Sequence, residues 1–216
     1  MNASLKKISL LIFCLSLSAC QSMYFSAMEK VGIHKRDILV DRVGDARDSQ
    51  VEAKETFKSA LDRFQTVLSV EETDLQEKYD VMSDEFNDAE KSSTKVSERI
   101  DEIKDVAEAL FDEWHDELDQ YTNDKLKNQS QKKLNATKSK YEQLMQTMRR
   151  AESKMAPVLS ALKDQVLFLK HNLNAQAINA MKGELANIQG DVSRLIKDME
   201  TSIAESEAFI AQLEKS

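Results

Sequence analysis

A cysteine near the N-terminus is the residue with the clearest chemical role in this sequence. Cys20 follows Leu17-Ser18-Ala19, and two lysines and an apolar run over residues 8–18 lie upstream of it. A basic start, a short apolar run and small residues before a cut site make up a secretory signal, and a cysteine directly after the cut offers its thiol for lipid attachment. The pattern predicts a cleaved signal peptide over residues 1–19 and a lipid on Cys20. The apolar run is too short for a permanent transmembrane helix, which needs about 20 residues.

Few other residues have the types and spacing that catalysis or metal binding requires. The chain has three histidines in three separate segments, His34, His115 and His171. None has a glutamate three residues before it, which excludes the repeated Glu-x-x-His motif of di-iron bundles. Asp112 and Asp116 could share a helical face with His115, but the neighbouring Trp114 is expected to face the core, so His115 should point outward. We therefore predict no catalytic residue, no cofactor and no metal site.

Composition restricts the partners and the fold. Removing residues 1–19 leaves 28 basic against 38 acidic residues, a net charge near −10 that argues against nucleic acid. Cys14 would leave with the signal peptide and Cys20 would carry the lipid, so no disulfide is expected. Four glycines and one proline in 216 residues leave little for tight turns. The composition favours long helices.

Apolar residues repeat at alternating steps of three and four in four long stretches, which is the pattern of coiled-coil and bundle helices. It predicts an all-α fold of long antiparallel helices in an elongated bundle over residues 35–216. The predicted helices span residues about 35–70, 74–121, 130–172 and 175–214. Gln50 is the polar residue in the first core-facing row. We expect its amide to reach solvent, the alternative being a buried polar residue that fixes helix register.

The second and third predicted helices carry opposite charges. Residues 71–121 hold 19 acidic and 5 basic side chains, whereas residues 122–172 hold 4 acidic and 11 basic ones. If the chain folds back between them, the acidic run 105–119 lies beside the basic run 125–140. Single exposed pairs stabilise little, but many aligned pairs favour an antiparallel hairpin.

The segment between the anchor and the bundle, residues 20–34, is predicted to be a short helix or a disordered tether. Gly32 suits a helix end, and a basic cluster of His34, Lys35 and Arg36 follows it. Two interpretations stay open for this cluster. It either marks the restart of the helix, or it is a docking surface close to the membrane.

Several stretches of the chain resemble a known family. They are Ala27 to Val43 (AMEKVGIHKRDILVDRV), Gly44 to Gln50 (GDARDSQ) and Phe57 to Leu61 (FKSAL). The stretches are similar to a family of proteobacterial lipoproteins catalogued as domain of unknown function 2959. The resemblance implies an exported, lipid-anchored, coiled-coil-rich protein and brings no established activity. Gln21 stands where an aspartate would retain a lipoprotein in the inner membrane, so the resemblance also implies the inner leaflet of the outer membrane.

The sequence thus favours a non-enzymatic, lipid-anchored periplasmic protein that acts as a structural or interaction scaffold. The expected partners are the membrane, through the N-terminal lipid, and a protein of unknown identity, and homo-oligomers are left open. The alternative is a helical protein that binds or remodels membranes. The acidic total argues against that alternative, because anionic headgroups attract Lys and Arg.

Overall fold

The computed structural model describes residues 24–25, 27–69, 74–172 and 175–215. Within these ranges the fold is all-α and contains no strand, as predicted. A short helical segment covers residues 24–25 and 27–30. The four long helices are α2 (Lys35–Ser69), α3 (Leu75–Leu118), α4 (Asp124–His171) and α5 (Ala175–Glu214). None of these described helices combines the length and the apolar character needed to cross a bilayer.

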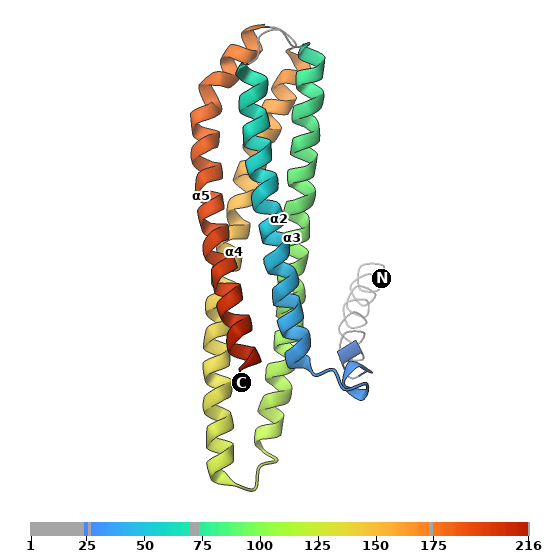
Figure 1. Ribbon diagram of the computed structural model, residues 1–216, viewed down its shortest axis with the longest axis vertical. Helices are drawn as coiled ribbons and strands as arrows, with labels where there is room; N and C mark the ends of the chain where they lie inside the picture. The colour runs from blue at the N-terminus through green and yellow to red at the C-terminus, as the bar shows by residue number, and fades with distance from the viewer. Residues whose placement is uncertain (1–23, 26, 70–73, 173–174, 216) are drawn as a thin grey trace, which may run out of the picture.

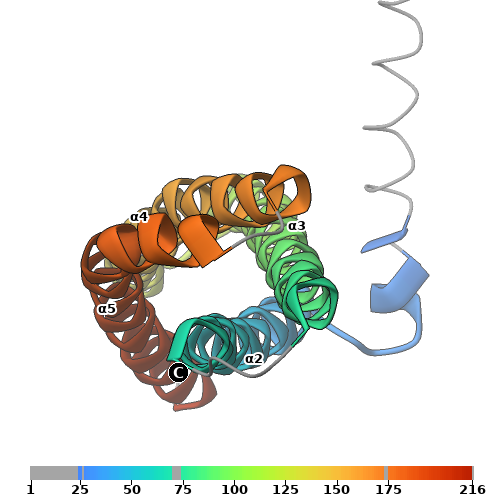
Figure 2. The ribbon, with the colours of Figure 1, turned by 90° about the horizontal axis from the view of Figure 1, so that it is seen from above.

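The long helices form an elongated four-helix bundle (Figure 1). Helix α2 packs against α3 and α5, and α4 packs against the same two neighbours. Seen from above, the helices follow one another around the bundle in chain order (Figure 2). At 1.5 Å per residue, the 48 residues of α4 reach about 70 Å. The hairpin of α3 and α4 extends beyond the start of α2 and the end of α5 (Figure 1).

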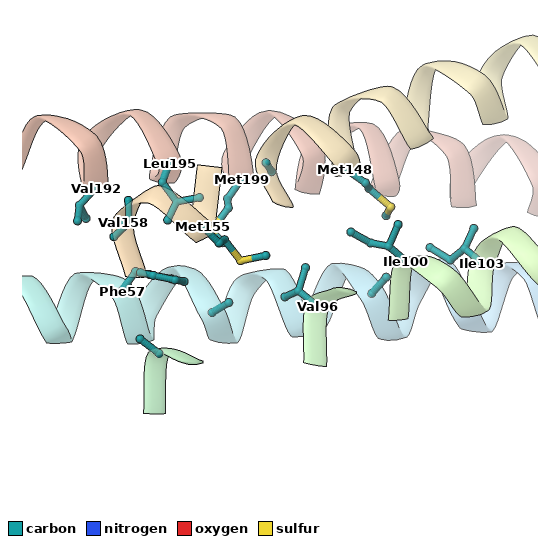
Figure 3. Close-up of a cluster of buried hydrophobic side chains, with 14 of the residues drawn as sticks. Phe57, Val96, Ile100, Ile103, Met148, Met155, Val158, Val192, Leu195 and Met199 are labelled. Atoms are coloured by element: carbon teal, nitrogen blue, oxygen red, sulfur yellow. The ribbon is translucent and has the colours of Figure 1, made fainter. Parts of the chain in front are cut away.

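The interior consists of apolar side chains from all four long helices. Figure 3 shows part of it, where Phe57 of α2, Val158 of α4 and Leu195 of α5 lie together, and Ile100 of α3 lies near Met148 of α4 further along the bundle. Each of these side chains is buried. Most residues of the predicted core-facing rows are buried, and most of the others pack against the core, which supports the spacing rule on which the helices were predicted. Tyr121, at the end of the second row, is exposed.

A polar layer interrupts this core, and here the sequence-based expectation was wrong. Gln50 is 0 % exposed, and neither its Oε1 nor its Nε2 has a hydrogen-bond partner among the described residues. On α5 the buried residues are Ser202 and Ser206, whereas Ile203, the expected core residue, is only half-buried. The sequence-based prediction missed this layer because it chose the apolar residue Ile203 as the next core position after Met199. Steps of three and then four from Met199 lead instead to Ser202 and Ser206, which are polar.

The α3–α4 hairpin forms as its charges predict. Lys127 Nζ lies 3.0 Å from Asp119 Oδ1, and the Trp114 indole N–H donates to Ser130 Oγ at 2.8 Å. Helix α4 begins six residues earlier than predicted, at Asp124, because the Asn123 side chain accepts hydrogen bonds from two backbone N–H groups of the first turn. The predicted polar break is therefore a short turn between Leu118 and Asp124.

Candidate functional site

The segment next to the predicted lipid site docks on the bundle. Cys20 itself lies outside the described residues, as does the predicted signal peptide over residues 1–19. Of the helical segment that follows, Phe25 is buried and Met28 packs against the core. The segment ends at Gly32, whose φ of 86° is a left-handed conformation that glycine adopts without strain. Residues 24–25 and 27–30 are thus helical, and Phe25 and Met28 hold this part of the segment against the bundle.

Lys35 makes the polar part of this junction. Its side chain is largely buried, and its Nζ pairs with Glu29 of the N-terminal segment and with Glu113 of α3, the second at 2.9 Å. The same ammonium group therefore joins three elements. Because it is enclosed by these carboxylates, Lys35 does not offer a free charge, so the expectation of a surface cluster of three basic residues was wrong for Lys35. His34 and Arg36 are exposed, and their part of the docking hypothesis stays a prediction.

The two carboxyls respond differently to their shared partner. Hydrogen bonding from Lys35 holds the pKa of Glu29 below its ordinary value. Burial raises the pKa of Glu113, which accepts from the same ammonium group. Burial alone would lower the pKa of Lys35, but hydrogen bonds to both carboxylates outweigh it and the pKa is raised. At neutral pH the Lys35 ammonium group is therefore charged and pairs with the carboxylate of Glu29.

A groove of about 590 Å³ opens beside this junction. It is lined by Tyr24 and Met28 of the N-terminal segment, by Ile210 of α5, and by α2 residues that include Gly44. The groove also contains charged side chains of both signs, Asp41, Arg42, Asp45, Arg47 and Asp48. A groove with both charged and apolar side chains is better suited to binding another protein than to binding a small apolar ligand.

The sequence contained signals for some of these residues. A glycine in the middle of a helical pattern, as at Gly44, often marks a packing or functional reason. No pattern pointed to Glu29 and Glu113, which are 6 and 78 positions from Lys35. In the described part of the chain no group of three His, Cys, Asp or Glu side chains could hold a metal ion. His115 is exposed, which agrees with its predicted outward direction.

The tip of the α3–α4 hairpin is a second candidate surface. Tyr121 is 41 % exposed and Leu126 is 50 % exposed, at the end that extends beyond α2 and α5 (Figure 1). Lys125 lies beside Leu126 and is also exposed. An aromatic and an aliphatic side chain next to a lysine at a protruding turn could contact a partner protein.

The fold and these surfaces define an elongated antiparallel four-helix bundle with a docked N-terminal segment. Comparison with protein families matches residues 24–213 to a family described as protein of unknown function (DUF2959). The chain belongs to this family. A search of curated proteins found no match.

Proposed function

We propose that the protein is a lipid-anchored periplasmic scaffold, tethered by Cys20 to the inner leaflet of the outer membrane, whose bundle binds a protein partner. The observation that carries the proposal is the Lys35 junction. Lys35 joins the segment that follows Cys20 to α3 through Glu29 and Glu113. A tether that is fixed to the bundle gives the bundle a defined position relative to its anchor, which a scaffold needs.

The hairpin tip is the surface we assign to the partner. Residues 119–126 are exposed throughout, and they include Tyr121 and Leu126. Aromatic side chains at protruding, solvent-accessible positions are enriched at protein interfaces. The Asp119–Lys127 ion pair and the Trp114–Ser130 hydrogen bond hold the two helix ends together below the tip.

The test places a photo-crosslinking amino acid at Leu126 in cells, with the same probe at the exposed Thr94 in the middle of α3 as the control. We expect a discrete crosslinked product from position 126 and none from position 94. Cys20→Ser should release the protein from the membrane fraction and reduce the crosslink. Equal products from both positions, or normal membrane fractionation of Cys20→Ser, would contradict the proposal.

The alternative, direct membrane binding by the helices, is favoured by one feature. Tyr24, Val31 and Ile33, close in sequence to Cys20, are exposed apolar or aromatic residues. Co-sedimentation of the soluble 21–216 fragment, which carries neither the predicted signal peptide nor the lipid, with anionic vesicles separates the two functions. Binding of that fragment would favour membrane binding, and its absence would favour the scaffold.

A further inference from the structure

Gly44 lies on the exposed face of α2, and packing inside the bundle does not explain why this position is a glycine. A Cβ added to Gly44 would meet no atom within 4 Å, so the bundle itself does not require a small residue. Glycine destabilises a helix interior relative to alanine, and its main use in such a place is to let another backbone come close. We propose that this face binds a second copy of the chain, with the two α2 helices side by side and parallel, and Gly44 at the contact.

The side chains around Gly44 form two flanks of opposite character. At about 100° per residue, Asp37, Asp41 and Asp48 fall on one side of a line through Gly44. Arg36, Val40 and Arg47 fall on the other side, and Val51 lies close to the line. Val51 is 40 % exposed. The face is therefore acidic along one edge and basic or apolar along the other.

This division of charge selects the parallel arrangement. When a twofold axis runs along the helices, the acidic flank of one α2 meets the basic flank of the other at the same height. Asp37 then lies beside Arg36 of the second copy, and Asp48 beside Arg47 of the second copy. An antiparallel pair centred on Gly44 instead sets Asp41 against Asp48 of the second copy, and this juxtaposition of like charges is unfavourable.

The ion pairs that Arg36 and Arg47 make on this face can be replaced by ion pairs with the second copy. Among the residues that the structure describes, Arg36 forms an ion pair with its chain neighbour Asp37, at 3.6 Å, and Arg47 with its neighbour Asp48, at 2.7 Å. Because these pairs join adjacent residues on the surface, they tie no two helices of the bundle together. Replacing them by pairs between two chains loses nothing inside either bundle. The parallel arrangement also leaves both N-terminal segments at the same end.

A disulfide test reports the geometry directly. Val51→Cys in the full-length protein places two thiols at the same height across the proposed axis, where mild oxidation should give a covalent dimer. In an antiparallel pair these thiols would lie about 20 Å apart, at 1.5 Å per residue, and could not join. Thr94→Cys, exposed on α3, is the matched control and should stay monomeric. No dimer from Val51→Cys, or equal dimer from both variants, would overturn the proposal.

Two further sets of variants test the contact without oxidation, with mass measured by light scattering of the full-length protein in detergent. Gly44→Leu should abolish the dimer, whereas Gly183→Leu, at a second helical glycine with open space around it, should leave it intact. Asp48→Arg should weaken the dimer, and Arg47→Asp with Asp48→Arg should restore it. Melting temperatures report folding separately. A monomeric wild-type protein, or a dimer indifferent to Gly44→Leu, would refute the interface.

Discussion

The Lys35 ammonium group in α2 lies 2.9 Å from the Glu113 carboxylate in α3, although the two residues are 78 positions apart. Lys35→Glu would place a negative charge between Glu29 and Glu113. Because Lys35 is largely buried, we expect a loss of about 1–3 kcal/mol in the free energy of unfolding. Arg36→Glu, on the exposed neighbour, should change it by less than about 0.5 kcal/mol. Urea denaturation followed by circular dichroism measures the free energy of unfolding of both variants. Equal losses in Lys35→Glu and Arg36→Glu would show that the ion pairs of Lys35 do not stabilise the fold.

Glu29 should make this junction sensitive to acid. Its folded-state pKa is depressed, chiefly by the hydrogen bond from Lys35. A depressed pKa contributes stability above the unfolded value, here 4.5, and this contribution is lost as the pH falls through the folded value. Glu113 shifts the opposite way and does not add to the loss.

The measurement is the difference in melting temperature between wild type and Glu29→Gln at several pH values. We expect the wild type to be more stable at pH 7, and the difference to shrink as the pH falls below 4.5, the unfolded value. A difference that stays constant from pH 7 to strongly acidic solution would mean that Glu29 acts through packing and not through its charge.

Tyr141 should resist ionisation. Burial raises its pKa to about 12, and its ring packs edge-on against Phe111 with the centroids 5.4 Å apart. The folded pKa lies above the ordinary value of 10, so Tyr141 contributes stability below pH 10, and this contribution is lost as the pH rises through about 12.

Absorbance at the tyrosinate band, compared between wild type and Tyr141→Phe, isolates this residue among the four tyrosines of the chain. The difference should appear near pH 12. A difference centred near pH 10, the unperturbed value, would show that the phenol is hydrated in the folded protein.

The sequence predicts the helices better than their junctions, for a physical reason. Helical periodicity is local, so Ile100 and Met155 could be placed in the core from their neighbours alone. The environment of Lys35 depends on which carboxylates the tertiary fold brings near, and a basic residue between His34 and Arg36 has the same local pattern whether it is buried or exposed. The opposite net charges of residues 71–121 and 122–172 predicted the α3–α4 hairpin, because a charge imbalance over many residues can be read from the sequence.

The polar layer in the core provides the last prediction. Lys54 of α2 pairs with Glu200 of α5 at 3.8 Å, and one turn further along these antiparallel helices Gln50 reaches the height of Ser202 and Ser206. Within the part of the chain that the structure describes, the Gln50 amide and the Ser202 hydroxyl have no hydrogen-bond partner, whereas Ser206 Oγ donates to the Ser202 carbonyl at 2.8 Å. A buried polar group without a hydrogen bond costs about 1–3 kcal/mol.

Replacing the groups that lack partners should therefore stabilise the fold. We expect Gln50→Met and Ser202→Ala each to raise the free energy of unfolding by about 1 kcal/mol or more. Ser206→Ala is the matched control, because it removes a satisfied hydroxyl one turn away and should lower the free energy slightly. Urea denaturation measures all three. Destabilisation by Gln50→Met would show instead that an internal water or a Gln50–Ser202 hydrogen bond satisfies the polar groups of this layer. The layer would then fix the register of α2 against α5, because a polar group in a core can specify one helix alignment over its alternatives.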